Sequence, residues 1–388
     1  MKAISEKIKL RHSKSVREKA GVQKTVVTEA QKGGDIRTEN LNLVGLIPLI
    51  TPRALKSKLA ASANVLKNVS SARSEIGDII VGNDQRMIVV AGPCSIHDPA
   101  EALEYADRLS KLRDELADDL MILMRVYFEK PRTIVGWKGL ISDPCLDGSS
   151  DIAYGLRTAR NLLLKINSLG VPAAAEMLDP FVPQYTADLI SWASIGARTT
   201  ESQIHRQMAS GLSMPVGFKN STDGNIQVAV DAMESARHPH SFLGIDEEGR
   251  TAIVRTRGNV NGHLILRGSG SGPNYAAKWT REACRRMSAS GLRPALMVDC
   301  SHGNSGKSFK AQESVWSNVL HQRITGNNAI IGMLLESNLF EGSQKVTEYT
   351  GKLRYGVSIT DECIGWKTTV RLFRNAARLM RKRKTKNL

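Results

Sequence analysis

Charged side chains follow a series of short apolar runs in this 388-residue sequence, and many of them are cations. Guanidinium groups bind phosphate and carboxylate through paired hydrogen bonds, while lysine supplies a point charge or a proton. Six such cations gathered in one place predict a polyanionic substrate, or two phosphorylated substrates. The six are Arg125, Lys130, Arg132, Arg198, Lys219 and Arg267.

A second group of side chains has the types that bind transition metals. It combines a thiol, an imidazole and two carboxyl groups, from Cys94, His302, Glu336 and Asp361. Mixed ligands of this kind suit a divalent transition metal better than Ca²⁺ or Mg²⁺, although no local spacing motif joins these four. A metal ion beside many cations suggests activation of a carbonyl group on a phosphorylated sugar. On these residues alone, aldol-type condensation and phosphoryl chemistry both remain open.

The elements that position these groups are eight apolar runs alternating with segments of helical periodicity. Runs that are apolar throughout and separated by helices are typical of parallel strands covered on both faces. The count and length predict an α/β fold, a single (β/α)₈ TIM barrel over residues 87–380. An open doubly wound sheet is the alternative, but its glycine fingerprint is absent. The runs are 87–92, 120–128, 171–178, 191–198, 215–220, 262–268, 295–301 and 329–337.

Each run ends with a polar or ionisable group, and the carboxyl ends of barrel strands form one mouth. Charged groups at a half-buried mouth are costly unless they bind a ligand or one another. The sequence therefore predicts one site at this mouth. Residues 241–259 alternate with period two around Glu248-Gly249, which predicts a β-hairpin inserted between the fifth and sixth units.

The formal charge of +16 invites a polyanion-binding interpretation, but its position argues against one. Residues 1–34 contribute +6 and residues 371–388 contribute +8, so residues 35–370 are nearly neutral at +2. We expect 1–34 to be a basic flexible arm and 381–388 a basic tail. No zinc-knuckle, helix-turn-helix or RNA-binding pattern is present, so we expect no nucleic-acid partner.

Residues 35–86 are predicted to be an N-terminal extension with one amphipathic helix after Thr51-Pro52, apolar at Leu55, Leu59, Ala63, Leu66 and Val69. No run is long enough to span a bilayer, and the first residues lack the apolar centre of a secretory signal. The five cysteines include no CxxC pair, which disfavours disulfides. We therefore expect a cytoplasmic protein with no membrane partner.

Several long motifs resemble those of one enzyme family, the type I 3-deoxy-D-arabino-heptulosonate 7-phosphate (DAHP) synthases. The resemblance runs from about residue 40 to about residue 375 and is closer to the tyrosine-sensitive isozymes than to the phenylalanine-sensitive ones. It implies condensation of phosphoenolpyruvate with erythrose 4-phosphate, at the entry to the shikimate pathway of aromatic amino acid biosynthesis. The motifs are GPCSIHD (92–98), MRVYFEKPRTIVGWKGL (124–140), GARTTESQ (196–203), GLSMPVGFKN (211–220), HLILRG (263–268), DCSHGNS (299–305), LLESN (334–338) and YGVSITDECIGW (355–366).

The resemblance also implies roles for individual residues. Cys94, His302, Glu336 and Asp361 would bind a divalent cation, Mn²⁺, Fe²⁺ or Zn²⁺, and Lys130, His302 and Cys94 would be the catalytic residues. Erythrose 4-phosphate would contact Arg132 and Thr133, while Pro180, Gln184 and Ser213 would line a regulatory pocket for tyrosine as feedback inhibitor. We expect a homo-oligomer, a dimer or a tetramer. Phosphoenolpyruvate would be bound by Arg125, Lys130, Glu176, Arg198, Lys219 and Arg267.

Three alternatives stay open at this point. A related synthase that makes an eight-carbon acid from arabinose 5-phosphate is disfavoured by the KPRT run at 130–133. A scaffold or nucleic-acid-binding protein would act through its tails instead of a cavity. A secondary-metabolism copy would keep the catalytic residues without feedback control, and the basic arm and the GSGSGPNY run after Arg267 depart from the family pattern.

Overall fold

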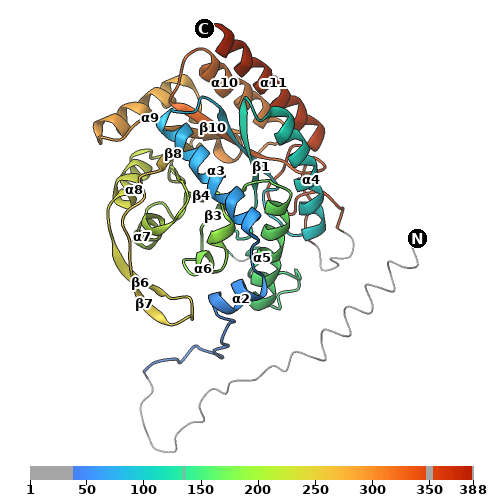
Figure 1. Ribbon diagram of the computed structural model, residues 1–388, viewed down its shortest axis with the longest axis vertical. Helices are drawn as coiled ribbons and strands as arrows, with labels where there is room; N and C mark the ends of the chain where they lie inside the picture. The colour runs from blue at the N-terminus through green and yellow to red at the C-terminus, as the bar shows by residue number, and fades with distance from the viewer. Residues whose placement is uncertain (1–37, 133, 135, 347–352, 387–388) are drawn as a thin grey trace, which may run out of the picture. The chain divides into compact units, whose positions relative to one another are not determined.

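The computed structural model describes residues 38–132, 134, 136–346 and 353–386, and its centre is a closed barrel of parallel strands. The predicted (β/α)₈ TIM barrel is confirmed, with the order β1-β10-β9-β8-β5-β4-β3-β2 around the barrel (Figure 1). The strands are β1 (Met87–Gly92), β2 (Leu120–Arg125), β3 (Ala173–Glu176), β4 (Trp192–Ile195), β5 (Val216–Lys219), β8 (Gly262–Leu266), β9 (Leu296–Asp299) and β10 (Ile330–Glu336).

Helices cover the outside of this barrel, which explains why the strand sequences are apolar on both faces. Strands β1, β2 and β10 are buried at every residue. Pairing of Gly92 with Glu336 places the ends of β1 and β10 at the same level of the mouth. The helices are α4 (Pro99–Leu116), α5 (Ile152–Ser168), α6 (Val182–Thr186), α7 (Gln203–Gly211), α8 (Gln227–Arg237), α9 (Ala277–Ala289), α10 (Ala311–Ile324) and α11 (Trp366–Lys386).

The predicted single helix after Thr51-Pro52 is wrong, because the structure divides it into α2 (Pro52–Lys58) and α3 (Ala63–Val81). The Ser62 hydroxyl accepts a hydrogen bond from the Val65 amide at 3.3 Å and so caps a new helix there. The buried face of α3 also differs from the predicted one, since Leu66 is 45% exposed.

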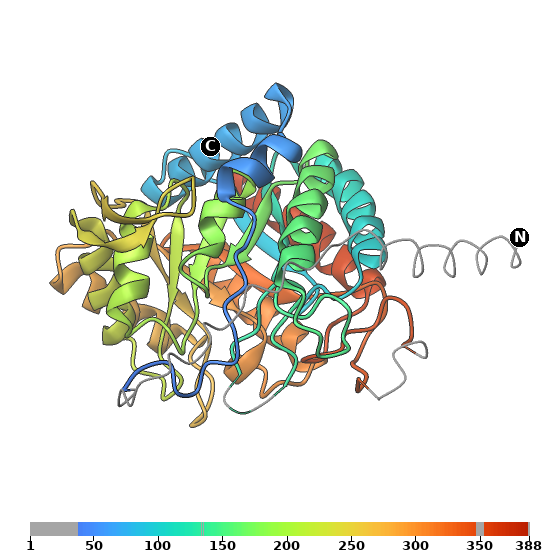
Figure 2. The ribbon, with the colours of Figure 1, turned by 90° about the horizontal axis from the view of Figure 1, so that it is seen from below.

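Helix α3 closes the amino-terminal end of the barrel. Its buried residues Ala72, Ile76, Ile79 and Ile80 join a core cluster with side chains from the strands, including Trp192. Figure 2 shows α3 at the end of the barrel opposite to the long loops that follow β2 and β10. The mouth at the carboxyl ends of the strands is therefore the open end.

The predicted hairpin between the fifth and sixth units is present. It consists of β6 (Ser241–Ile245) and β7 (Thr251–Arg255), which pair antiparallel from Ser241 opposite Arg255 to Ile245 opposite Thr251. Gly249 has a φ of 74° in its turn, a conformation that glycine adopts without strain.

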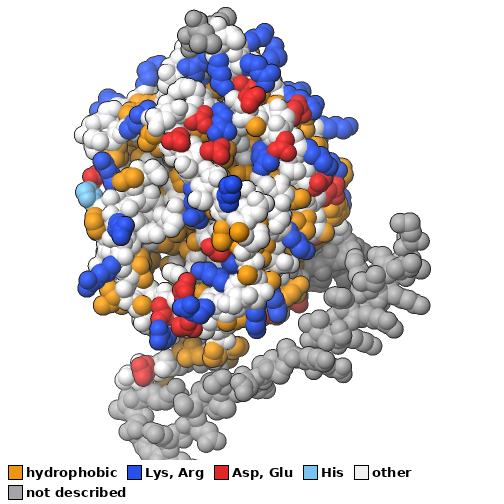
Figure 3. Space-filling view, in the orientation of Figure 1, with side chains coloured by type: hydrophobic (Ala, Val, Ile, Leu, Met, Phe, Trp, Pro, Cys, Tyr) orange, Lys and Arg blue, Asp and Glu red, His pale blue; other side chains and the backbone are white. Residues whose placement is uncertain are grey.

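Helix α11 extends through most of the segment predicted as a basic tail. Arg374 forms an ion pair with Glu115 of α4, and Arg381 and Lys384 both pair with Asp119, which is only 1% exposed. Asp119 immediately precedes β2, so these contacts lie at the barrel end remote from the mouth. Figure 3 shows Lys and Arg side chains gathered around the C-terminal end of the chain, with acidic side chains among them.

Residues 51–388 form one compact unit. The described residues 38–50 belong to another unit, and these thirteen residues contain no helix or strand. The predicted flexible arm at 1–34 lies outside the described residues. Within the part of the chain that the structure describes, no helix is long and apolar enough to cross a bilayer.

Candidate active site

The carboxyl ends of the strands surround a small polar cavity of about 130 Å³. It brings together residues that are far apart in the sequence, as the predicted barrel mouth requires. Nine predicted site residues line it: Arg125, Lys130, Arg132, Glu176, Arg198, Lys219, Arg267, His302 and Asp361. Gly196 also lines the cavity, and a Cβ at this position would collide with the carboxylate of Glu176.

Three of the four predicted metal ligands form a tight group. Donor atoms of Cys94, Glu336 and Asp361 all lie within 4.8 Å of one another. His302 lies outside this group but close to it, with its Nε2 atom 3.7 Å from Oε1 of Glu336. A thiolate, two carboxylates and an imidazole at these distances fit a divalent transition metal, provided that the side chains close slightly around the ion.

Arg125 connects the metal-ligand group to the cationic half of the cavity. Its side chain is 1% exposed and donates hydrogen bonds to the carbonyl of Cys94 at 3.2 Å and to Glu336 at 3.0 Å. Its guanidinium also lies 3.5 Å from the ring centre of Tyr127, a cation–π contact. Burial lowers the pKa of Arg125, but the neighbouring Tyr127 and Glu336 raise it by more. The net pKa is above the usual value, so the group keeps its charge.

Lys130 contacts Cys94 directly. Its Nζ atom lies 3.1 Å from the sulfur and 3.3 Å from the carbonyl oxygen of Cys94. Burial and the negative charge of Glu336 raise the pKa of the Cys94 thiol, while Lys130 and Arg125 oppose this rise. A bound metal ion would take up the thiolate and displace its proton.

Asp299 at the end of β9 joins two predicted site residues, a link that the sequence did not indicate. Its Oδ2 atom lies 3.3 Å from Nζ of Lys219 and 3.0 Å from Nδ1 of His302. Burial opposes ionisation, but His302 and Lys219 hold the pKa of Asp299 well below its usual value. Since Asp299 contacts Nδ1, the Nε2 atom of His302 faces the metal-ligand group.

The outer part of the cavity carries the remaining cations. Burial lowers the pKa of Arg267, and the positive charge of Arg198 lowers it too, although Asp299 acts in the opposite direction. A bound phosphate would relieve this repulsion between cations. Lys307 also lines this part of the cavity and was not predicted. Arg132 is exposed and donates a hydrogen bond to the carbonyl of Trp137 at 2.8 Å, and Thr133 lies outside the described residues.

The predicted regulatory residues lie away from this cavity. Pro180 and Gln184 line a separate apolar groove of about 470 Å³ between α6, α7 and the β6–β7 hairpin. Ser213 is exposed and does not line the groove, whereas its neighbour Leu212 does. Among the described residues, none lines both the cavity and the groove.

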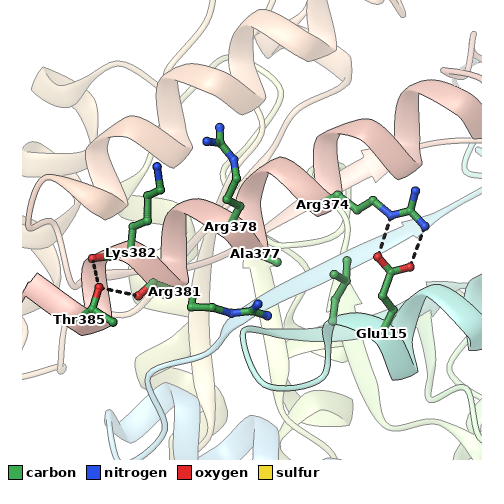
Figure 4. A pocket seen from close by; sticks show the side chains of 8 residues that line it. Glu115, Arg374, Ala377, Arg378, Arg381, Lys382 and Thr385 are labelled. Atoms are coloured by element: carbon green, nitrogen blue, oxygen red, sulfur yellow. Dashed lines mark hydrogen bonds and ion pairs between the residues drawn. The ribbon is translucent and has the colours of Figure 1, made fainter.

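A larger hollow lies between α4 and α11, with a volume of about 600 Å³ (Figure 4). Its polar walls are mostly cations of α11, including Arg374 and Arg381, which already pair with Glu115 and Asp119. None of the described residues that line it carries a thiol or imidazole group. Size alone therefore does not select the candidate active site, and the arrangement of ionisable groups favours the polar cavity at the barrel mouth.

Comparisons with known proteins show which family the chain resembles. A sequence profile of the DAHP synthetase I family matches residues 58–374. The phospho-2-dehydro-3-deoxyheptonate aldolase, Tyr-sensitive, of Escherichia coli (strain K12) is 52% identical over 335 residues, which cover 86% of this chain and 94% of that protein. The Phe-sensitive protein of the same organism is 53% identical over 348 residues, which cover 90% of this chain and 99% of that protein.

A solved structure gives the same result. The phospho-2-dehydro-3-deoxyheptonate aldolase from Francisella tularensis SCHU S4 superimposes with a TM-score of 0.86 at 46% identity, covering 88% of this chain and 99% of that one. The Tyr-sensitive and Phe-sensitive proteins of E. coli are about equally similar, so these comparisons support the family and leave the choice of inhibitor open. The chain belongs to the DAHP synthetase I family.

Proposed function

We propose that this protein is a 3-deoxy-7-phosphoheptulonate synthase, which converts phosphoenolpyruvate, D-erythrose 4-phosphate and water into DAHP and phosphate. The observation that carries this proposal is one cavity in which a Cys–Glu–Asp metal-ligand group adjoins the cations. Two phosphorylated substrates need the cations, and an aldehyde electrophile needs polarisation of its oxygen. The mouth of the barrel provides for both.

The inner cations would bind phosphoenolpyruvate. Arg125 and Lys219 are almost fully buried, and each has a carboxylate neighbour that fixes its position, Glu336 and Asp299 respectively. Arg198 and Arg267 would bind the phosphate group, because their mutual repulsion favours an anion between them. Arg132, further out, would bind the phosphate of erythrose 4-phosphate. Positioning the two substrates in this way lowers the activation barrier by several kcal/mol.

Cys94, His302, Glu336 and Asp361 would hold a divalent cation, Mn²⁺, Fe²⁺ or Zn²⁺, which when bound supplies Lewis-acid polarisation of the aldehyde oxygen. Lys130 would donate a proton to that oxygen, since its Nζ atom lies beside the Cys94 sulfur at 3.1 Å. The methylene carbon of phosphoenolpyruvate forms a bond to the aldehyde carbon. Water then adds to the cationic carbon that remains, and cleavage of the C–O bond releases phosphate.

Phosphate release with both substrates tests this proposal. We expect release only when phosphoenolpyruvate and erythrose 4-phosphate are both present, loss of release after treatment with a chelator, and recovery when Mn²⁺ is returned. Arabinose 5-phosphate in place of erythrose 4-phosphate should give little release. Full turnover in the chelated protein, or a preference for arabinose 5-phosphate, would overturn the assignment.

We also propose that an aromatic amino acid, tyrosine, inhibits the enzyme by binding in the groove between α6, α7 and the hairpin. The walls of the groove include Phe242, Met208 and Val254, which suit an aromatic ring, and Gln184 supplies a polar contact. Titration of turnover with tyrosine, phenylalanine and tryptophan tests this idea. Gln184→Ala should weaken inhibition and leave uninhibited turnover unchanged, and equal inhibition of both proteins would contradict the assignment.

The β6–β7 hairpin supports a further proposal, that the protein is a homo-oligomer, a dimer or a tetramer. Leu243 and Ile253 on this hairpin are 79% and 69% exposed and lie opposite each other across the two strands, so they form an adjoining apolar pair of the kind found at protein–protein contacts. Sedimentation of the purified protein measures the state directly. Leu243→Glu should shift the distribution toward smaller species, and a wild-type protein that sediments as a monomer would refute this proposal.

A further inference from the structure

A long excursion of the chain between β10 and α11 carries one of the proposed metal ligands. It leaves the barrel after Glu336 and returns at Trp366, and Asp361 lies in its returning arm. The two arms are paired through the bridges Ser337–Ile364 and Ser343–Ser358. The distance between Glu336 and Asp361 therefore depends on how the two arms are fixed against the barrel.

One buried carboxyl group contacts both arms. Glu101, in the first turn of α4, is 2% exposed. The Asn338 side-chain amide of the outgoing arm donates a hydrogen bond to Oε1 of Glu101 at 2.5 Å. The Gly356 backbone amide of the returning arm donates to the other oxygen, Oε2, at 3.1 Å. His97 lies nearby, with its Nε2 atom 3.7 Å from Oε2.

A carboxylate is the side chain that this arrangement requires. Both arms present a donor, and only a carboxylate offers two acceptor oxygens without a donor of its own. Burial raises the pKa of Glu101 to about 7, which the two hydrogen bonds oppose, so a charge at this position is costly. Loss of either contact would leave a buried polar group unpartnered.

We propose that Glu101 is a positioning residue that fixes both arms of the 337–365 excursion and thereby sets the spacing of Glu336 and Asp361 for the metal ion. This inference rests on the proposed function, because it assumes that the two carboxylates bind the metal. Glu101 itself contacts neither ligand among the interactions of the described residues. Its effect on the metal acts through Asn338 and Gly356.

The test is the affinity for Mn²⁺ alone, measured from the electron paramagnetic resonance signal of free Mn²⁺ without substrates. Glu101→Gln keeps the shape but turns one oxygen into an amide donor that faces a donor. We expect the variant to bind Mn²⁺ about tenfold more weakly, which is the size of effect usual for mutations of residues that orient metal ligands. The matched control is Asp107→Asn on the same helix, whose exposed carboxylate pairs with Lys111 and with no described residue of the excursion, and which should not change the Mn²⁺ affinity.

A compensating variant separates positioning from general destabilisation. In Glu101→Gln with Asn338→Asp, the glutamine oxygen still accepts from the Gly356 amide. Its amide group donates to the new aspartate, so the contact with residue 338 is restored with donor and acceptor exchanged. We expect this double variant to recover most of the Mn²⁺ affinity. Because it can fold where the single variant does not, it also keeps the test decisive.

The outcomes distinguish this inference from the proposed function. Wild-type protein that binds no Mn²⁺ would overturn the metal centre, and this inference with it. Wild-type protein that binds Mn²⁺ while Glu101→Gln binds it equally well would overturn the role of Glu101 alone. Weak binding by the double variant, equal to that of the single variant, would also contradict positioning through these two hydrogen bonds.

Discussion

Among single residues, Cys94 connects the proposed metal ligands to the cations that are proposed to bind the substrates. It is fully buried, its donor atom belongs to the Cys–Glu–Asp group, and its sulfur contacts Lys130. We predict that Cys94→Ala folds but loses Mn²⁺ affinity by more than about 100-fold, because it removes a ligand and not a neighbour of one. Turnover should be lost with it. The control is Cys284→Ala on α9, outside the cavity, and full turnover of Cys94→Ala after chelator treatment would refute the metal site.

Asp299 supports a second prediction at this scale. Its carboxylate contacts both Lys219 and His302 and has no exposed surface. Asp299→Asn keeps the size of the side chain but removes the charge that orients these two groups, so we expect Mn²⁺ affinity to fall about 10- to 100-fold. The KM for phosphoenolpyruvate should rise as well, because Lys219 loses its partner. Wild-type values for both quantities would show that the contacts have no functional effect.

The site residues were predictable where they stand directly at strand ends. Arg125, Glu176 and Lys219 each end a strand, so the barrel rule alone places them at one mouth. The role of Asp299 was not predictable, because it depends on how His302 is turned, and His302 has a φ of 56° that no periodicity encodes. In the groove between α6, α7 and the hairpin, Leu212 lines the wall and the predicted Ser213 does not. A loop sequence does not specify this one-residue difference.

At the scale of elements, apolar periodicity predicted the strands better than the first helices. The strands are defined by burial on both faces, which leaves a continuous apolar signal. Residues 52–81 carry a helical pattern throughout, yet the chain breaks after Lys58 and restarts at Ala63. Ser62 is one serine among several in this segment, so its capping role emerges only when α3 packs against the end of the barrel.

A histidine inside the barrel gives an element-scale prediction about pH. His263 on β8 is fully buried and accepts a hydrogen bond from the Trp192 indole of β4 at 3.0 Å. Burial lowers the pKa of His263 from 6.5 to about 4, so the unfolded chain binds a proton that the folded barrel does not. The stability from this group is therefore present above pH 6.5 and is lost as the pH falls toward 4, by roughly 3 kcal/mol.

His263→Gln keeps an acceptor for the indole but cannot titrate. We expect urea unfolding of this variant to lose less stability between pH 6.5 and pH 4 than the wild type loses. His238→Gln, in which the replaced side chain is 64% exposed, should retain the wild-type dependence. Identical pH profiles for wild type and His263→Gln would show that the buried imidazole does not contribute to acid sensitivity.

At the scale of the whole molecule, the charge of +16 does not describe the active site. The C-terminal cations belong to α11 as far as the helix extends, and several pair with acids near the amino-terminal end of the barrel. The cations at the mouth lie in a region whose net charge is only +2. The basic segment and the cationic cavity proposed as the active site are thus separate features, at opposite ends of the barrel strands.

This separation predicts that the cations of α11 stabilise the fold and do not assist catalysis. Replacing Arg381 and Lys384 together by Ala leaves Asp119 buried without these two partners. Because an unpaired buried charge is costly, we expect the free energy of unfolding to fall by about 2 kcal/mol, less than for a fully buried pair since Arg381 is 62% exposed. Turnover at a temperature well below unfolding should remain unchanged.

The matched control removes the same charge from the same helix. Replacing Arg378 and Lys382 together by Ala changes the wall of the hollow between α4 and α11 (Figure 4) but removes no partner of Asp119. This variant should alter the free energy of unfolding by less than about 0.5 kcal/mol. Adding Asp119→Asn to the first variant should restore most of its stability, because the orphaned charge is gone. Equal losses in both double variants would mean that net charge, and not the pairing of Asp119, determines the contribution of this helix.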